Sequence, residues 1–322
     1  QETVLRFKKN KYLNFENPLI LTNNDYRFII EEQLKEIKVK PKLIIIEPEK
    51  KNTSPSILAA SLLEKETNSL LLMVPSDHLI TNNEKFIKTI KNACQLHEKG
   101  KLIIFGIKPS RIETGFGYIK VKNDLNKKKV IFEKFVEKPD LKKAKKYFEN
   151  LNYFWNSGLI LFRPKDMIQL FQKHDSKTLK IIIKSVEKGY NDLNFFRLDQ
   201  ESWKKSKNIS IDYSILEKTK KIKIIKANFP WNDLGDWKSI WEKGKKIKHG
   251  VSKKGLVKTI QSYDSLIHSY DKNQVITAVG VRDLMIVGMK DAVLVANKNQ
   301  TQNIKKLVTQ LKNKKISQSE LH

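Results

Sequence analysis

The chain has 322 residues, 39% of them hydrophobic, which is enough for one large domain with a small one or for two of medium size. Its formal net charge of +28 raises the question of nucleic-acid binding, but arginine accounts for only six of its 63 basic residues. Since arginine is the usual side chain for bidentate recognition of phosphates and bases, the lysine excess indicates solvated surface positions. We therefore expect no nucleic-acid partner.

The sequence also lacks the marks of a membrane or secreted protein. No apolar stretch approaches the ~20 residues of a membrane span, and residues 1–20 lack the apolar core of a signal peptide. The single cysteine, Cys94, cannot form an internal disulfide. We expect no membrane association and a cytoplasmic location.

Residues 18–107 alternate between short apolar runs and amphipathic stretches. The runs predict buried strands, as in a parallel sheet: PLILT (18–22), KLIIIEP (42–48), LLLMVP (70–75) and KLIIFGI (101–107). The stretches between them predict helices: NDYRFIIEEQLKEI (24–37), SPSILAASLLEKE (54–66) and NEKFIKTIKNACQLHEK (83–99). This alternation indicates an α/β fold, in which ligands bind beyond the carboxyl ends of the strands.

The rest of the chain is less regular. GFGYIKV, VIFEKFVEKP, YFWNSGLILF and KIKIIKA predict strands, whereas LKKAKKYFEN and SIDYSILEKT predict helices. After about residue 250, short apolar runs separated by turn residues predict a small all-β unit closed by a helix at 301–314, without a strict repeat. We therefore expect an α/β domain over residues 1–248 and a β domain over 249–322.

Two aspartates follow predicted strands in polar loops. Asp77 lies in VPSDH, and Asp233 lies in PWNDLGDW at the start of a predicted helix. Mg²⁺ takes one or two protein carboxylates together with phosphate oxygens, so both residues are candidate ligands. Both positions also suit a turn or a helix cap, and the residues alone leave the two interpretations open.

Polar residues stand at three further strand segments. Gly117 in TGFGYIK would let the main chain approach a ligand, although a bulge or tight turn explains it equally. Glu137 and Lys138 end a strand and suit either sugar hydroxyls and a phosphate or an exposed ion pair. Asn156 interrupts an apolar run, so its amide needs a partner from a ligand or from nearby main chain.

The loop EPEKKNTSPSI (47–57) joins a predicted strand to a predicted helix. Its residues Asn52, Thr53 and Ser54 precede Pro55, which is typical of a helix start. They either cap that helix or present polar atoms to a purine base or ribose.

The order of these segments is more informative than any one of them. EPEKKNTSP, VPSDH, FGIKPSRIETGFGYI, FVEKPDLKKA, YFWNSGLILF, SIDYSILEKT and WNDLGDW occur in succession. In this order the chain resembles the mannose-1-phosphate guanylyltransferase family, including its two-domain members that carry a phosphomannose isomerase. The resemblance covers nearly the whole chain. It implies a Rossmann-like nucleotidyltransferase domain of the glycosyltransferase-A type and a small C-terminal β unit similar to a left-handed β-helix.

The resemblance also implies a reaction and the residues that serve it. GTP and mannose 1-phosphate would be the substrates, and the sugar phosphate would attack the α-phosphorus in line to give GDP-mannose and pyrophosphate. Matched by motif, Asp77 and Asp233 would hold Mg²⁺, and Lys138 would meet the sugar phosphate. Glu137, Asn156, Gly117, Tyr118 and Asp212 would line the sugar pocket, and Asn52, Thr53 and Ser54 would face the guanosine.

One part of the family pattern is missing. The family opens with a strand and a Gly-rich loop of the kind GGxGxRLWPLSR that cradles the triphosphate, whereas this sequence begins at QETVLRF, which resembles the helix after that loop. We therefore expect a fragment that forms its sugar pocket but is nearly inactive alone. The end, ISQSELH, resembles the stretch that leads into the isomerase domain of two-domain members. The resemblance thus allows an isomerase domain beyond the C-terminus, and also a homodimer.

Three alternatives remain open at this point. The chain could be a nucleotidyltransferase for another sugar 1-phosphate or base, a non-catalytic subunit that binds sugar nucleotides, or a basic protein that binds nucleic acid. Assays with alternative substrates test the first, the coding sequence upstream of Gln1 tests the second, and salt-dependent retention on DNA tests the third.

Overall fold

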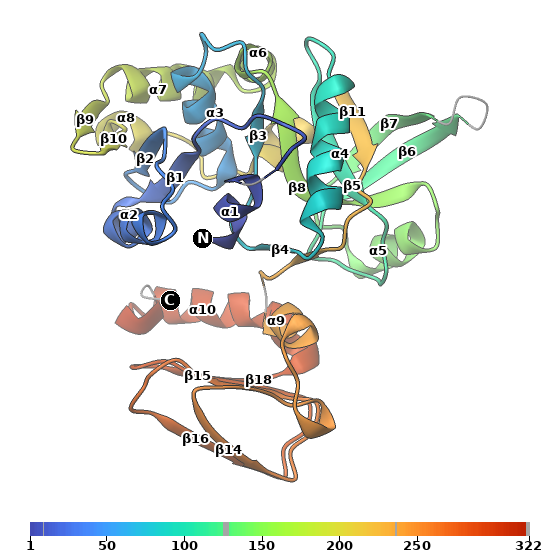
Figure 1. The fold of residues 1–322 in the computed structure, drawn as a ribbon, viewed down its shortest axis with the longest axis vertical. Coiled ribbons are helices and arrows are strands. Elements are labelled where there is room, and N and C mark those ends of the chain that lie inside the picture. Colours follow the sequence, from blue (N-terminus) through green and yellow to red (C-terminus); the bar gives the residue numbers. More distant parts are fainter. Residues whose placement is uncertain (9, 125–128, 236, 320–322) are drawn as a thin grey trace. The chain divides into compact units, whose positions relative to one another are not determined.

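The computed structural model describes residues 1–8, 10–124, 129–235 and 237–319 (Figure 1). By their contacts the residues form two compact units. The first comprises Gln1–Ser76 and Ile80–Trp231, and the second comprises Asp77–Leu79 and Asn232–His322. These units are defined by contacts between residues, whereas the domain boundary after residue 248 was expected from a change in the sequence pattern. That boundary therefore stays a prediction.

A four-stranded sheet in the first unit has the order β1-β2-β10-β9. Its strands are β1 (Leu19–Asn23), β2 (Leu43–Glu47), β9 (Tyr190–Asp192) and β10 (Phe195–Arg197). β2 pairs in parallel with both β1 and β10, whereas β9 runs antiparallel to β10. Beside it lie α1 (Glu2–Lys8), η1 (Asn24–Tyr26), α2 (Arg27–Glu36) and α8 (Gln200–Lys204). Leu34 of α2 packs on Ile44 and Phe195, which anchors that helix to the sheet.

A six-stranded sheet in the same unit has the order β11-β5-β8-β6-β7, with β3 also paired to β8. Its strands are β3 (Leu71–Met73), β5 (Leu102–Ile107), β6 (Tyr118–Asp124), β7 (Lys129–Val136), β8 (Tyr153–Phe162) and β11 (Ile222–Lys226). The four apolar runs of residues 18–107 are strands as expected, but the expectation of one parallel sheet is wrong. β3 and β5 both pair antiparallel with β8, because this long and mostly buried strand inserts between them.

Helices cover both faces of the six-stranded sheet, which confirms the α/β fold class (Figure 1). One face packs against α3 (Thr53–Leu63), α6 (Pro164–His174) and α7 (Ser176–Glu187). The other packs against α4 (Asn83–Gln95), whose first turn is capped by Asn82. α5 (Leu141–Phe148) follows β7 and is capped by Asp140.

The second unit is built mainly from short strands. β13 (Ser252–Lys254), β15 (Leu266–Ser269), β17 (Leu284–Gly288) and β18 (Val293–Asn297) form one sheet, and β14 (Leu256–Ile260) and β16 (Val275–Val279) form another. Two parallel registers, β14 with β16 and β15 with β17, pair residues 19 positions apart, such as Leu256 with Val275 and Leu266 with Met285, whereas β13 and β15 pair residues 14 apart. The paired positions carry different residues, so this spacing leaves no strict repeat in the sequence.

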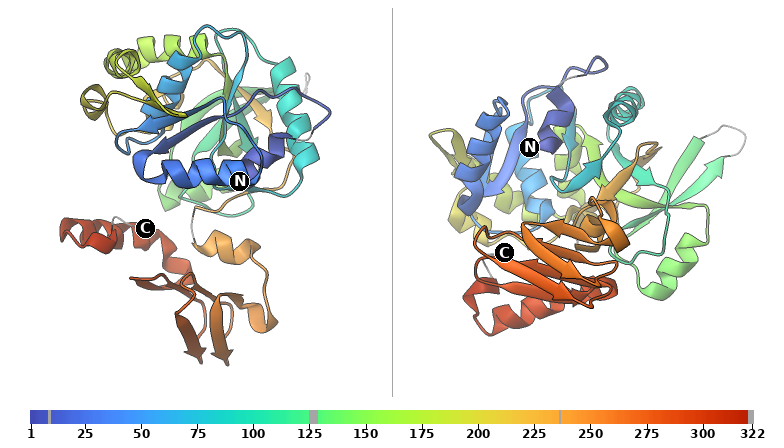
Figure 2. Two further views of the ribbon diagram at one scale, coloured as in Figure 1. Left: turned by 60° about the vertical axis from the view of Figure 1, so that its left-hand side comes forward. Right: turned by 60° about the horizontal axis from the view of Figure 1, so that its bottom comes forward.

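Helices complete the second unit, as Figure 2 shows. They are α9 (Trp237–Lys243), η3 (Lys248–Gly250), η4 (Lys298–Asn303), α10 (Ile304–Asn313) and η5 (Ser317–Ser319). Trp237 and Trp241 of α9 pack on Leu266 and Met285, and the Lys298 ammonium lies 3.8 Å from the centre of the Trp241 ring. These contacts explain why α9 groups with the strands that follow it.

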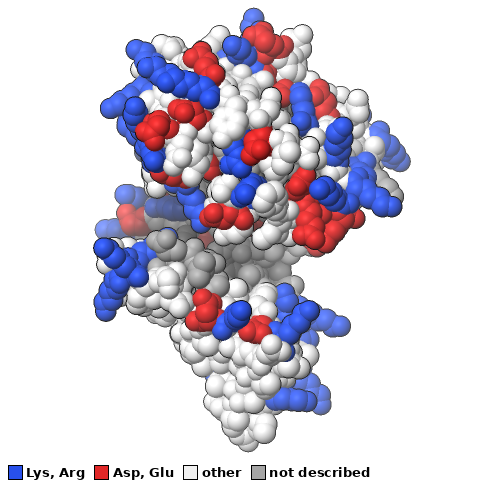
Figure 3. Space-filling model, turned by 90° about the vertical axis from the view of Figure 1, so that its left-hand side faces the viewer, with Lys and Arg blue, Asp and Glu red and all other residues white. Residues whose placement is uncertain are grey.

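The described part of the chain contains no helix that is both long and apolar enough to cross a membrane. On the face drawn in Figure 3, lysine and arginine side chains are scattered and interspersed with aspartate and glutamate. The absence of a nucleic-acid partner stays a prediction.

Candidate functional site

Glu137 and Lys138 directly follow β7 in the first unit. The Glu137 side chain is buried, and its Oε1 is contacted by the Lys138 ammonium, which is half exposed. The main-chain N–H of Glu137 donates to Glu217 Oε1 at 2.9 Å. Lys138 has a φ of 41°, a left-handed conformation that is uncommon for residues other than glycine. Such conformations gather at functional sites.

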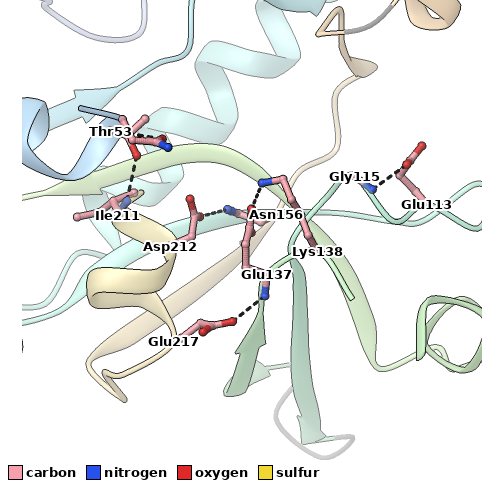
Figure 4. A network of polar contacts seen from close by, with 10 residues as sticks. Thr53, Glu113, Gly115, Glu137, Lys138, Asn156, Ile211, Asp212 and Glu217 are labelled. Carbon is pink, nitrogen blue, oxygen red and sulfur yellow. Dashed lines mark hydrogen bonds and ion pairs between the residues drawn. The ribbon is translucent and has the colours of Figure 1, made fainter. Parts of the chain in front are cut away.

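Asn156 lies in β8, immediately after the residues of that strand that pair with β6. Its Nδ2 donates to Asp212 Oδ1 at 3.2 Å (Figure 4). Its main-chain N–H donates to Gly117 O at 2.8 Å. Its Oδ1 is buried and has no hydrogen-bond partner among the described residues. A buried acceptor without a donor needs an explanation, and a ligand hydroxyl would supply the missing donor.

Gly117 faces the same place as Glu137 and Asn156. A Cβ atom at this position would lie 2.6 Å from Glu137 Oε2, 2.8 Å from Phe135 Cζ and 3.4 Å from Asn156 Cβ. Close approach, and not a special backbone conformation, therefore requires glycine here. The neighbouring Tyr118 is fully buried, and its hydroxyl donates to Glu113 O at 2.9 Å. A direct role for Tyr118 in sugar binding stays a prediction.

The segment that carries Asp212 is the π-helix η2 (Asp212–Leu216), where the chain was expected to be helical. The N–H of Glu217 donates to Asp212 O at 2.9 Å, which is the i to i+5 bond of this helix type. π-helical turns are rare and occur frequently at functional sites. This one turn places Asp212 within hydrogen-bond distance of the Asn156 side chain. It also places Glu217 within hydrogen-bond distance of the main-chain N–H of Glu137.

The start of α3 is tied to the same segment. The N–H of Ile211 donates to Thr53 Oγ1 at 3.0 Å, and the hydroxyls of Ser54 and Ser214 lie 2.7 Å apart, both fully buried. Asn52 caps α3 with φ 64° and ψ −172°, a region almost confined to glycine. Asn52 and Thr53 are exposed, whereas the Ser54 hydroxyl is already occupied by Ser214. The guanosine role of these three residues stays a prediction.

Burial and neighbouring negative charge raise the pKa values of the Glu137 and Asp212 carboxyl groups. Burial raises the pKa of Glu137, and the Asp212 carboxylate raises it further, against the lowering effect of Lys138. Burial likewise raises the pKa of Asp212 above its ordinary range. Burial lowers the pKa of Lys138, but the contact with Glu137 and the field of Asp212 outweigh it, so this ammonium stays charged.

The two candidate metal ligands both belong to the second unit. Asp77 immediately precedes β4 (His78–Ile80), and Asp233 ends β12 (Trp231–Asp233), the strand that pairs with β4. The N–H of Leu234 donates to Asp77 O at 3.1 Å, so the two segments run side by side. Asp77 is exposed, and Asp233 Oδ1 accepts the N–H of Gly235 at 2.6 Å.

These two carboxylates fit a magnesium ion that is completed by water and phosphate. No group of three or more acidic, histidine or cysteine side chains suited to a metal occurs among the described residues. Mg²⁺ needs only one or two carboxylates when substrate phosphates supply further oxygens. Their convergence on one ion stays a prediction.

The sequence reasoning missed Glu217 and Ser214. Both lie in SIDYSILEK, a segment expected to be helical. Glu217 follows Asp212 by five positions, a spacing that an ordinary helix does not place on one face. Only the π-helical turn brings both residues to the cluster, and the sequence carries no signal for it.

Two family models match the chain. A model described as "Nucleotidyl transferase" matches residues 3–250, and one described as "MannoseP isomerase/GMP-like beta-helix domain" matches residues 257–311. The chain belongs to the nucleotidyl transferase family. The α/β nucleotidyltransferase domain followed by a β-helix-like unit, as the resemblance implied, is thereby confirmed.

Curated relatives narrow the group to which this nucleotidyl transferase belongs. It is 39% identical over 319 residues to a mannose-1-phosphate guanylyltransferase of Salmonella montevideo, covering 97% of this chain and 66% of the relative. It is 36% identical over 319 residues to one of Escherichia coli, covering 97% and 68%. The alginate biosynthesis protein AlgA of Pseudomonas aeruginosa is 32% identical over 326 residues, covering 100% and 67%. The chain thus belongs with the mannose-1-phosphate guanylyltransferases and spans about two thirds of their length.

Solved structures support the fold. A Thermus thermophilus protein named as a mannose-1-phosphate geranyltransferase superposes with a TM-score of 0.73 at 23% identity, over 91% of this chain and 84% of that one. A Helicobacter pylori protein named as a mannose-6-phosphate isomerase gives 0.65 at 29% identity, over 72% and 90%. The fold of this chain thus resembles the folds of these two solved structures.

Proposed function

We propose that this protein is a mannose-1-phosphate guanylyltransferase, which joins mannose 1-phosphate to the GMP unit of GTP and releases pyrophosphate. The observation that carries the proposal is the buried cluster formed by Glu137 after β7, Asn156 within β8 and Asp212 of η2 in a nucleotidyl transferase fold. An open acceptor at Asn156 Oδ1 beside two carboxyls suits a polyhydroxylated ligand and repels a bare phosphate.

Each residue then has a distinct task. Glu137 and Asn156 accept sugar hydroxyls, and the Asp212 carboxyl holds the Asn156 amide in one orientation. Lys138, which is half exposed beside them, meets the phosphate of the sugar as a point charge. Asn52 and Thr53, exposed at the start of α3, face the guanosine.

Asp77 and Asp233 would hold Mg²⁺, which neutralises phosphate charge and orients the groups for in-line displacement. The two aspartates would fix where that cation sits, and the pairing of their segments supports this. In this reaction the protein contributes mainly position and charge, since no covalent intermediate with an enzyme side chain is required.

A pyrophosphate-release assay on the complete gene product tests the proposal. We expect release with GTP and mannose 1-phosphate in the presence of Mg²⁺, and much slower release when glucose 1-phosphate or ATP is substituted. Equal rates with the substitutes would assign a different nucleotidyltransferase. Binding of GDP-mannose without any turnover would assign a non-catalytic subunit.

The homodimer and the cytoplasmic location expected from the sequence stay predictions. Sedimentation equilibrium of the purified chain tests the first, and fractionation of the native cell tests the second.

A further inference from the structure

Three carboxyl groups and one ammonium belong to the cluster that contains the Asn156 amide. Asp212 accepts its Nδ2, Glu137 is contacted by Lys138, and Glu217 accepts the main-chain N–H of Glu137. The π-helix also brings Tyr213, whereas β6, β8 and the start of α3 contribute the uncharged groups Gly117, Asn156 and Thr53. Within this set a single positive charge faces three negative ones.

The ionised Glu137 and Asp212 side chains beside the single Lys138 ammonium form an electrostatically unfavourable arrangement. Glu137 is buried, and the Asn156 amide stands between it and Asp212 (Figure 4). When like charges share a site of low polarity, one of them is better kept neutral. A proton held by the pair removes one negative charge without removing either side chain.

The open acceptor on Asn156 points the same way. Asn156 Oδ1 is buried and has no donor among the described residues, and its Nδ2 is committed to Asp212. A carboxylate cannot donate, but a protonated carboxyl can. A shared proton therefore gives the pocket a donor for a ligand oxygen, while Asn156 Oδ1 stays open to a ligand hydroxyl.

We propose that Glu137 and Asp212 together keep one proton above the pH range in which ordinary carboxyl groups lose theirs, and that the pocket binds its sugar ligand in this singly protonated form. The pair is then both donor and acceptor, as are the hydroxyl groups of a sugar. The ligand's identity rests on the proposed function. A sugar phosphate next to Lys138 draws that ammonium away from Glu137 and adds negative charge, so the complex retains the proton more firmly.

The electrostatics of the two groups agree with this geometry. Burial is the largest cause that raises the pKa of Glu137 and also that of Asp212, and the charge of Asp212 adds to the effect on Glu137. The two groups therefore titrate as a pair, and the proton is not assigned to one residue alone.

Carboxyl ¹³C NMR of the ligand-free chain, followed from about pH 4 to about pH 9, tests the shared proton directly. We expect one step of the pair well above the ordinary range of carboxyl groups. Asp212→Asn should move the Glu137 step to lower pH, and Glu137→Gln should do the same for Asp212 if the first variant fails to fold. Independent ionisation of both carboxyls in the ordinary range, or an unchanged Glu137 step in Asp212→Asn, overturns the proposal.

Glu47 provides a matched control because burial also raises its pKa while it lies outside the pair. Glu47→Gln should leave the titration of Glu137 and Asp212 unchanged. A shift of both steps in this variant would show that the titration reports a global change of the fold and would overturn the assignment to a pair.

Calorimetric titration with GDP-mannose tests the second half of the proposal. The affinity should fall about tenfold for each pH unit above the upper step of the pair, and Glu137→Gln should remove this dependence. An affinity that does not change with pH would show that the proton is not needed for binding. If the NMR step is present but GDP-mannose does not bind at any pH, the sugar assignment fails while the shared proton stands.

Discussion

The chain holds its two groups of functional carboxylates in opposite ways. Glu137 and Asp212 are engaged by Lys138 and Asn156 inside the first unit. Asp77, in the second unit, is exposed, and its segment is joined to that of Asp233 by a main-chain hydrogen bond from Leu234. The first group is shaped by the protein's own bonds before a ligand arrives, whereas the role proposed for the second depends on a bound cation.

The largest effect on activity should come from removing the carboxylates of Asp77 and Asp233. Asp77→Asn combined with Asp233→Asn should reduce kcat of the complete gene product about 1,000-fold, because a bound cation contributes several kcal/mol of charge stabilisation. Pyrophosphate release measured against Mg²⁺ concentration checks this. Asp25→Asn, which removes an exposed carboxylate from η1, should keep the original rate and Mg²⁺ dependence. A double variant that retains its rate would remove these aspartates from the metal site.

The second-largest effect should come from the cluster of Glu137, Asn156 and Asp212, which the protein's own hydrogen bonds hold in place. Asn156→Ala should weaken binding of mannose 1-phosphate between about tenfold and 100-fold, because it deletes the open acceptor and leaves Asp212 without its donor. We expect the KM for the sugar phosphate to rise while the KM for GTP stays nearly constant. A variant in which only the GTP constant changes would place Asn156 at the wrong end of the site.

A smaller effect tests how tightly the preformed group is packed. Gly117→Ala should lower sugar affinity by about tenfold, since the new methyl group would lie 2.6 Å from Glu137 Oε2 and force this side chain to move, at a cost of about 1–3 kcal/mol. Gly100→Ala is the comparison variant, because its methyl group meets nothing within 4 Å and only its positive φ is strained. It should lower stability slightly and leave affinity unchanged. Equal affinity losses in the two variants would argue against a packed pocket.

The smallest effect should appear in stability against pH. The folded-state pKa values of Glu137 and Asp212 are raised above those of the unfolded chain, so the folded protein binds more protons between the two values. Their contribution is fully present below the ordinary carboxyl pKa and is lost as pH rises through the folded-state values. Urea unfolding at a series of pH values should show this decline in the wild type and a flatter curve in Asp212→Asn. Asp77→Asn, which changes only the exposed group, should keep the wild-type decline.

The sequence predicted the layers of the first unit and the segments that carry the site. Apolar runs and amphipathic stretches identified the strands and helices, since burial on two faces and on one face leave different patterns. The order of β3, β5 and β8 could not be read from them, because strand pairing depends on contacts between residues far apart in the chain. The 19-residue register of the second unit was hidden for a similar reason, as only its spacing repeats.

Site residues could be predicted where the residue type is unusual for its place in the sequence. Glu137 and Lys138 stand out as polar residues at the end of an apolar strand and Asn156 as one inside such a strand, and the structure brings them together. Ser214 and Glu217 do not stand out, because their positions depend on a π-helical turn and on the bonds from α3. Ser54 illustrates the reverse case, as a polar residue in a promising loop whose hydroxyl is used inside the protein.

A crystal structure of the chain with GDP-mannose would test most directly whether the preformed cluster is a sugar pocket. We predict sugar hydroxyls within about 3 Å of Glu137 and of Asn156 Oδ1, with the Asn156 to Asp212 bond retained. Mannose bound elsewhere, with Asn156 Oδ1 still lacking a donor, would contradict the account.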